Sequence, residues 1–130
     1  MDNQNIMIDT SIIIDHLRKQ NKEKSILFKI VDLYNFHLST IVEFELFAGA
    51  TNENKIKDIN EILGICIIHP LSSEIAKEAA RIYQNLRQIN QLIEIRDIFI
   101  AAASIVNNFP LITLNMRHFE RIDSLELISS

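Results

Sequence analysis

The stretch NIMIDTSIIIDHL, residues 5–17, changes its pattern of apolar residues within a few positions. Its first part is a short apolar run, which predicts a strand over residues 5–9. Thr10 or Ser11 can cap a helix that follows directly and continues to Leu17. A strand followed at once by a helix is typical of a chain in which the two elements alternate.

The alternation continues to the end of the chain. Further strands are predicted at residues 37–40, 65–69, 111–113 and 125–128, and helices at 23–36, 41–50, 56–63, 72–90 and 97–107. We expect Gly64 to close the helix before it in a left-handed conformation. Strands joined by crossover helices are typical of a parallel sheet. The predicted fold class is therefore α/β, with a central, mainly parallel sheet of about five short strands.

The composition excludes several classes of protein. Of 130 residues, 48% are hydrophobic and 23% are charged, with two glycines and two prolines, which is unlike a disordered chain. The longest apolar run, residues 98–103, is far shorter than the roughly 18 residues of a bilayer span, and the N-terminus lacks the basic residues of a secretory signal. We expect a single domain, residues 1–130, in the cytoplasm and without membrane contact. The lone Cys66 is expected in the core.

The charge balance limits how the chain can meet nucleic acid. The 13 Lys and Arg against 17 Asp and Glu leave a net charge of -4, whereas proteins that bind nucleic acid electrostatically are usually basic. Any such contact must be local. A further explanation is that part of the excess carboxylate is gathered at one site, where a cation neutralises it.

Three acidic residues occupy positions where a carboxylate is costly. Asp9 ends an apolar strand, Glu45 lies in a mostly apolar helix, and Asp97 begins a helix that is apolar on nearly every side. The natural site in a parallel sheet is the crevice at the carboxyl ends of its strands, and carboxylates gathered there need a positive partner. Oxygen ligands suit Mg²⁺ or Mn²⁺ better than zinc. Metal-bound water attacking phosphorus is the chemistry of phosphodiester hydrolysis.

Four motifs in series resemble those of the PIN domain family, specifically the VapC-type toxin ribonucleases of type II toxin-antitoxin systems. The motifs are Ile8–Ser11, Glu45–Gly49, Asp97–Ala102 and Thr113–Phe119. The resemblance implies a three-layer α/β/α sandwich and a Mg²⁺-dependent endoribonuclease that a cognate antitoxin silences and that commonly forms a homodimer. The family's three acidic positions fall on Asp9, Glu45 and Asp97. Its fourth polar position, often Asp, falls on Asn115, which leaves open whether one or two ions bind.

The resemblance and the residues together predict a division of roles. Asp9 and Asp97 are expected to hold Mg²⁺, Glu45 to hold the ion or orient its water, and Asn115 to complete the rim of the catalytic site. Weaker candidates are Ser11 and Thr113, for hydrogen bonds to a ligating carboxylate, and Arg96 and Arg117, for contact with RNA phosphates.

Structural explanations compete with each of these roles. Asp9 can cap the helix that follows it, and Asp97 can serve as a helix-start acid. Helical spacing alone does not separate Glu45 from Glu43, and Glu94 is expected to be an exposed loop residue. At the level of the whole protein, the alternative is a non-catalytic PIN-like protein-binding module in which an ion stabilises the acidic cluster. Basic residues between positions 18 and 24 are read as a solubilising surface that can also touch RNA.

Overall fold

The computed structural model describes residues 3–129, which form one five-stranded sheet in the order β3-β2-β1-β4-β5. The strands are β1 (Gln4–Ile8), β2 (Tyr34–Ser39), β3 (Cys66–His69), β4 (Leu111–Ile112) and β5 (Leu127–Ile128). Each neighbouring pair in this sheet runs parallel. The prediction of a central, mainly parallel sheet of about five short strands is confirmed.

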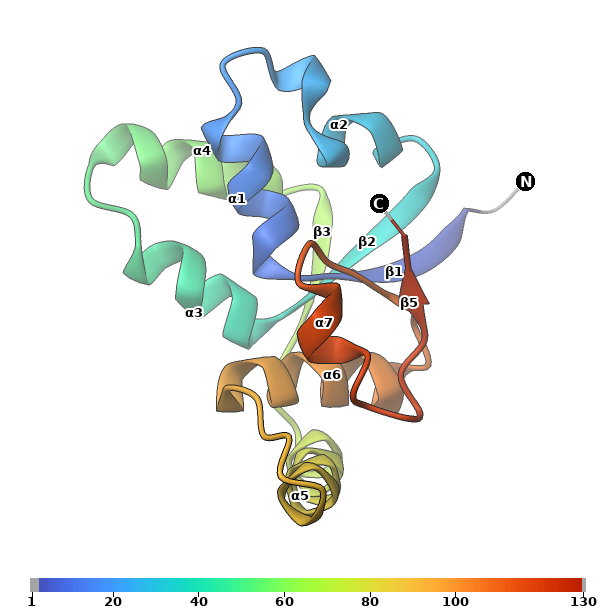
Figure 1. Ribbon diagram of the computed structural model, residues 1–130. Coiled ribbons are helices and arrows are strands. Elements are labelled where there is room, and N and C mark those ends of the chain that lie inside the picture. Colours follow the sequence, from blue (N-terminus) through green and yellow to red (C-terminus); the bar gives the residue numbers. More distant parts are fainter. Residues whose placement is uncertain (1–2, 130) are drawn as a thin grey trace.

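Helices cover both faces of the sheet. They are α1 (Thr10–Arg18), the 3-10 helix η1 (Lys22–Lys24), α2 (Ile26–Ile30), α3 (Thr40–Ala48), α4 (Glu53–Leu63), α5 (Ser73–Gln88), α6 (Ile95–Asn107) and α7 (Met116–Phe119). Figure 1 shows α1, α2 and α4 on one face and α5, α6 and α7 on the other, while α3 contacts both α1 and α6. This arrangement is the expected three-layer α/β/α sandwich.

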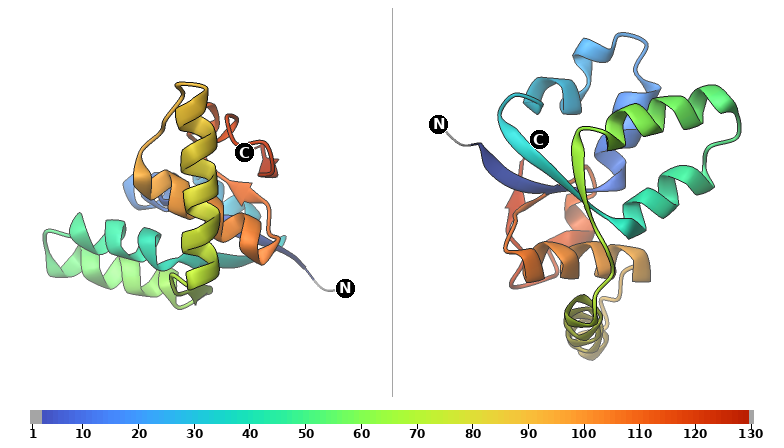
Figure 2. Two further views of the ribbon diagram at one scale, coloured as in Figure 1. Left: turned by 90° about the horizontal axis from the view of Figure 1, so that it is seen from below. Right: turned by 180° about the vertical axis from the view of Figure 1, so that it is seen from behind.

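The helix α6 is apolar on nearly every side because it packs against α5 on one side and the sheet on the other. Figure 2 shows α5 lying outside α6, so α6 is enclosed between α5 and the sheet. The run Ile100–Ala103 is 0% exposed, and so is the run Ile6–Ile8 of the central strand β1. Small alanine side chains in α6 allow its backbone to lie close to the sheet. No helix among residues 3–129 combines the length and the apolar character that a membrane crossing needs.

Serine side chains cap the N-termini of α3 and α5, as the sequence predicted. Ser39 Oγ accepts a hydrogen bond from the backbone N–H of Ile41 (3.1 Å), and Ser72 Oγ accepts one from Ile75 (3.2 Å). Both serines satisfy amide groups that the first turn of a helix leaves without partners. Gly64, in contrast, is right-handed with φ -64°, so the expected left-handed closure at this residue is wrong.

The segment before β2 departs most from prediction. A helix over residues 23–36 was expected, but α2 covers five residues and Tyr34–Phe36 belongs to β2. Tyr34 pairs with Gln4 and Phe36 with Ile6 of β1. Pairing with a distant strand satisfies the backbone of this segment and overrides its local helical spacing. The last strand is also shorter than predicted, beginning at Leu127, and the short helix α7 was not predicted.

A histidine pair links β2 and β3. His37 Nδ1 lies 2.8 Å from His69 Nε2, and His37 Nε2 lies 2.9 Å from Asn5 Oδ1. Burial, followed by the proximity of His69, lowers the pKa of His37. Cys66 at the start of β3 is partly buried, and burial raises the pKa of its thiol to about 12, which makes it a poor nucleophile.

Candidate active site

The strand order places a crevice where β1 and β4 lie side by side. The chain builds the sheet outward from β1 to β3 and then returns to the other side of β1 with β4. Connections that leave two neighbouring strands in opposite directions open a crevice at their carboxyl ends. Asp9 follows β1 at this point and Thr113 follows β4, and the backbone N–H of Asp9 donates to the carbonyl of Ile112 (3.0 Å).

Asp9 is held by two hydroxyl groups on one of its oxygens. The side chain is 2% exposed, and its Oδ2 accepts hydrogen bonds from Ser11 Oγ and from Thr113 Oγ1, both at 2.7 Å. Asp9 precedes α1, but its side chain makes no capping bond to the backbone of that helix, so the helix-capping explanation does not hold. Among residues 3–129, Oδ1 receives no protein hydrogen bond and is therefore free to meet a ligand.

The two hydroxyls are themselves oriented by backbone amides. Ser11 Oγ accepts from the N–H of Leu114 (3.0 Å), and Thr113 Oγ1 accepts from the N–H of Asn115 (2.9 Å). A hydroxyl has a single proton, so an oxygen that accepts from an amide directs that proton toward Asp9. Ser11 and Thr113 thus lie where the sequence suggested they could contact a carboxylate.

Glu45 reaches the same region from α3. Its Oε1 accepts from Thr10 Oγ1 (3.1 Å), and its Oε2 lies 3.4 Å from Arg96 Nη1. Burial raises the pKa of the Glu45 carboxyl, Thr10 and Arg96 lower it, and the charges of Asp9 and Asp97 raise it again. The structure therefore brings Glu45 into the electrostatic field of both predicted acids.

Asp97 enters from the first turn of α6. Burial raises the pKa of its carboxyl, and the negative charge of Asp9 raises it further, while His118 acts in the opposite direction. His118 Nδ1 lies 3.4 Å from Asp97 Oδ2, is buried, and makes no well-aligned hydrogen bond within residues 3–129. The negative charge of Glu94 raises the pKa of Asp97 by a smaller amount, and Glu94 is itself ion-paired with Arg96.

The three carboxylates influence one another without forming a closed cage. Within the described part of the chain, no group of three or more His, Cys, Asp or Glu side chains is arranged to hold a metal ion as it stands. The expectation of three acids already gathered round one ion is therefore not met. The donor chemistry still fits Mg²⁺, because this ion keeps several waters and is usually bound directly by one or two carboxylates. The shared field of Asp9, Glu45 and Asp97 supplies the negative charge that such an ion needs.

The family model described as PIN domain matches residues 6–125. The chain belongs to the PIN domain family.

Three relatives of this PIN domain share its length. Ribonuclease VapC1 of Methanocaldococcus jannaschii is 30% identical over 122 residues, covering 94% of this chain and 84% of the relative. Ribonuclease VapC of Rickettsia bellii is 31% identical over 131 residues, covering 95% of each chain. Ribonuclease VapC19 of Mycobacterium tuberculosis is 29% identical over 121 residues, covering 92% of this chain and 96% of the relative.

Solved structures share the fold of this PIN domain. VapBC2 from Rickettsia felis, crystallised with a DNA fragment from its promoter, has a chain that superposes with a TM-score of 0.84 at 22% identity, covering 98% of this chain and 99% of that one. A chain of VapBC-1 from nontypeable Haemophilus influenzae gives a TM-score of 0.83 at 24% identity, covering 97% and 98%. The fold described above is thus shared with chains of these solved structures.

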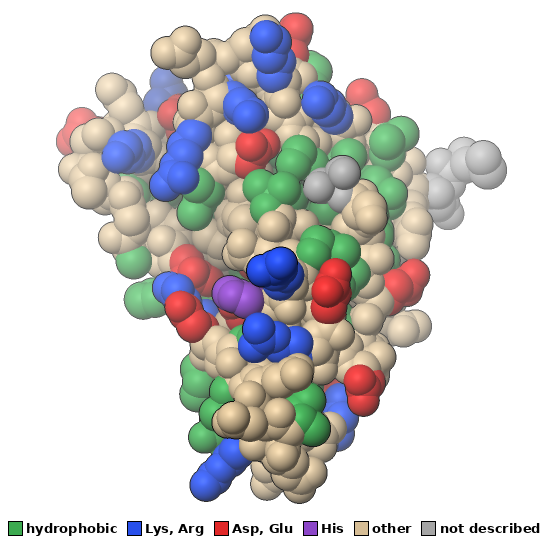
Figure 3. All heavy atoms as spheres, viewed as in Figure 1, with side chains coloured by type: hydrophobic (Ala, Val, Ile, Leu, Met, Phe, Trp, Pro, Cys, Tyr) green, Lys and Arg blue, Asp and Glu red, His purple; other side chains and the backbone are tan. Residues whose placement is uncertain are grey.

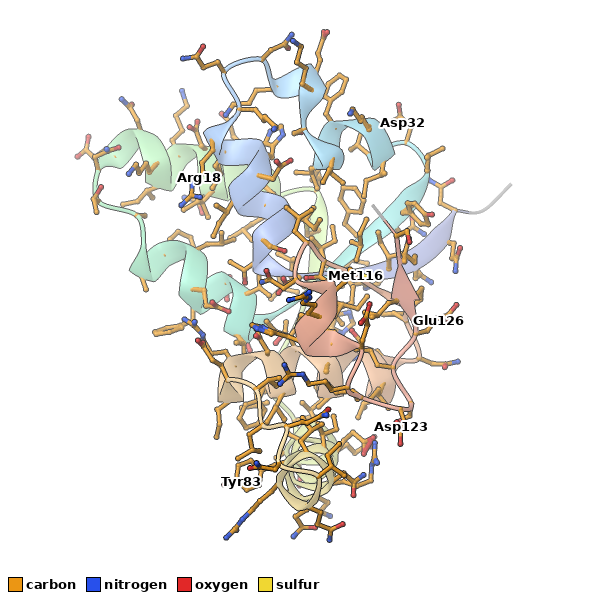
Figure 4. All side chains as sticks on the ribbon, viewed as in Figure 1. Arg18, Asp32, Tyr83, Met116, Asp123 and Glu126 are labelled. Atoms are coloured by element: carbon orange, nitrogen blue, oxygen red, sulfur yellow. The ribbon has the colours of Figure 1, made fainter. Side chains whose placement is uncertain are left out.

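The remaining predicted residues of the PIN domain lie around the rim. Asn115 precedes α7 and is exposed, and Arg117 within α7 is exposed without an ion pair among the described residues. Arg96 is half-exposed and faces Glu45 and Glu94, so its charge is already balanced. The structure adds His118, which the sequence analysis did not select, to the residues around the candidate site. His118 lies on α7, and its side chain contacts Asp97. Figure 4 labels Met116, the first residue of that helix.

Proposed function

We propose that this PIN domain is a Mg²⁺-dependent endoribonuclease of the VapC type, the toxin of a toxin-antitoxin pair, inhibited by its cognate antitoxin. The observation that supports the proposal is a set of hydrogen bonds: Ser11 and Thr113 hold one oxygen of the buried Asp9, and the adjoining Thr10 donates to Glu45. The negative charges of Asp9 and Asp97 each raise the pKa of Glu45, and that of Asp9 raises the pKa of Asp97. The relatives named Ribonuclease VapC support hydrolysis of RNA, and the neighbours named VapBC support a protein partner.

The residues divide the work as follows. Asp9 and Asp97 would hold Mg²⁺, or Mn²⁺ in its place, and the bound ion supplies an activated water and charge neutralisation for phosphodiester hydrolysis. Ser11 and Thr113 fix one oxygen of Asp9 and leave the other available. Glu45 orients water beside the scissile phosphate, with Thr10 holding its Oε1. Asn115 offers an amide oxygen at the rim.

Cations near the site match an anionic substrate. Arg117 is exposed and lies two residues after Asn115, which suits contact with an RNA phosphate. Arg96 balances Glu45 while the site holds no substrate. Because Arg96 is 52% exposed, this pair is weak and can exchange when a phosphate arrives.

The experiment uses the full chain, purified free of any antitoxin, and a set of structured and single-stranded RNAs. Mg²⁺ or Mn²⁺ should allow discrete cuts and EDTA should stop them. Asp9→Asn and Asp97→Asn should each remove cleavage while circular dichroism remains that of the folded chain. Asp32→Asn is the matched control, because Asp32 is exposed and lies far from the crevice (Figure 4). Cleavage that persists in EDTA, or that survives both active-site substitutions, contradicts the proposal.

The alternative, a non-catalytic PIN-like binding module, has one observation in its favour. Arg96 faces Glu45 and His118 faces Asp97, so two of the three acids already have basic neighbours. In that case a folded, partner-free sample cuts none of the RNAs at millimolar Mg²⁺. The same sample would still bind a partner protein, and Asp97→Asn would leave that binding unchanged.

We also propose that the protein is a cytoplasmic homodimer. The support is a set of exposed large hydrophobic residues on elements that contact each other: Phe44 on α3, Ile95 at the start of α6 and Leu92 just before it. Apolar side chains grouped on one face are typical of a surface that another protein covers. A single species of monomer mass in light scattering at working concentration contradicts the dimer.

A further inference from the structure

A pocket opens between α1, α3 and α4, beside the crevice that holds the acids. Its cavity volume is about 270 Å³. Leu17, Leu46 and Ile59 form an apolar floor, and Glu45 stands on its wall. Because Glu45 lines the pocket and is also one of the three predicted acids, the pocket adjoins the candidate active site. A substrate bound at the acids therefore has this pocket as a neighbour.

Two basic side chains that form no ion pair among the described residues, Arg18 and Lys55, line this pocket. Arg18 is exposed and has no carboxylate within ion-pair distance among the described residues, and Figure 4 shows it beside α4. Lys55 is exposed, and the hydrogen bond of its Nζ is to Thr51 Oγ1, at 3.3 Å. Asp58 also lines the pocket, so the opening is mixed in charge rather than uniformly acidic. Exposed cations without carboxylate partners are available to an anion.

The positive charge extends away from the pocket along the surface. Residues 18–29 hold five of the 13 Lys and Arg of the chain but one of its 17 Asp and Glu. Figure 3 shows Lys and Arg side chains gathered on the part of the molecule formed by α1, α2 and α4. In a chain with a net charge of -4, this surface, residues 18–29, carries a local excess of positive charge that attracts a polyanion. We name it the basic segment.

We propose that the pocket and the basic segment bind the single-stranded RNA that flanks the scissile phosphate. A base or ribose lies on the apolar floor, and the adjoining phosphates meet Arg18 and Lys55. Proteins hold single strands by combining a positively charged groove with side chains, most often aromatic, against which the bases stack; in this pocket the surface for the base is aliphatic. The volume, close to the lower limit of small-ligand sites at about 300 Å³, fits one nucleotide unit. The inference rests on the proposed function, since it assumes RNA at the acids.

The test compares a double variant with a chemically matched control. Arg18→Gln with Lys55→Gln removes the two pocket cations, and Arg87→Gln with Lys77→Gln removes the same charges from exposed positions on α5, across the sheet. Both pairs are placed in Asp97→Asn protein, so that the RNA stays intact. The probe is a fluorescein-labelled 12-nucleotide single-stranded RNA of mixed sequence. Anisotropy gives Kd at several salt concentrations.

The expected loss follows from counterion release. Affinity for a single strand falls with salt to a power of about 0.7 for each phosphate contact, so one contact is worth roughly fivefold at 0.1 M salt. The pocket variant should raise Kd roughly 25-fold and reduce the slope of log Kd against log salt by about 1.4. The α5 control should change neither quantity by more than about twofold. Equal Kd and slope in the two variants, or no measurable binding by the parent at low salt, overturns the inference.

A second measurement separates this inference from the proposed function. In protein that keeps Asp97, the pocket variant should raise KM for RNA cleavage while kcat at saturating RNA stays near that of the parent. If the parent cuts RNA with Mg²⁺ and the pocket variant matches the α5 control in KM, the active site stands and the RNA path is wrong. If the parent cuts no RNA, the proposed function fails, and the anisotropy result still decides whether this surface binds RNA.

Discussion

Replacing Thr113 by valine tests whether the hydroxyls on Asp9 are essential to the site. Thr113 is 0% exposed, and valine has nearly its shape, so the substitution opens no cavity. It removes the hydrogen bond to Asp9 Oδ2 and also the acceptor of the Asn115 amide, a loss that is the same in every background. A hydrogen bond to a charged group contributes about 1.5–3 kcal/mol. We expect that loss in the free energy of unfolding, measured by urea denaturation in EDTA, and a fall in Tm of roughly 5–12 °C. The loosened Asp9 should also bind Mg²⁺ about 10–100-fold more weakly in calorimetry.

Two controls isolate the hydroxyl from the rest of the side chain. Thr113→Ser keeps the donor and loses one buried methyl group, which costs about 1 kcal/mol. In an Asp9→Asn background the bond no longer involves a charge, so Thr113→Val should cost about 1 kcal/mol less than in the parent. If Thr113→Val costs no more than Thr113→Ser, or the same in both backgrounds, the hydroxyl does not hold the carboxylate and the reasoning fails.

Further predictions concern the acids. Asp97→Asn should raise Tm in EDTA, because burial and Asp9 raise the pKa of Asp97 and make its charge unfavourable, and should abolish the rise in Tm with Mg²⁺; an unchanged response to Mg²⁺ contradicts this. Burial raises the pKa of both Glu45 and Asp97, so in EDTA their contribution to stability is full below about pH 4 and is lost as pH rises through the raised values. In thermal melts at about pH 4 and about pH 8, the Tm of the parent should therefore fall more with rising pH than the Tm of the double variant Glu45→Gln with Asp97→Asn. Equal falls in the two proteins would refute the raised pKa values. Glu45→Gln should lower kcat at least about 100-fold and Glu43→Gln less than about twofold, because Glu45 is the α3 acid bonded to Thr10; equal losses would exclude Glu45 as the functional acid.

The sequence alone singled out two acids as candidates because their positions make a carboxylate costly to bury. Asp9 ends an apolar strand and Asp97 begins a helix that is apolar on nearly every side. Helical spacing could not separate Glu45 from Glu43, since the two differ by rotation about one helix, and the contact of Glu45 with Thr10 is a tertiary one. The family resemblance selected the same residue.

Two other features could not be predicted from local sequence patterns: the contact of His118 with Asp97, and the strand at residues 34–36. His118 lies on α7, which has four residues and is too short to show helical periodicity, so nothing in the sequence placed it at Asp97. Residues 34–36 carry helical spacing but pair with β1, a preference set by a strand some thirty positions earlier. In both places the deciding interaction is distant in the chain, where propensity carries no information.

The hydrogen bond between Thr113 and Asp9 joins residues 104 positions apart, and β4 lies next to β1 in the middle of the sheet. During translation the N-terminal part of a chain emerges first, so Asp9 leaves the ribosome long before Thr113 is made. A nascent chain that stops before β4 has Asp9 without one of its two hydroxyl donors and without the adjoining strand. An assembled crevice therefore requires synthesis through β4 and Thr113, and a product interrupted before β4 lacks it.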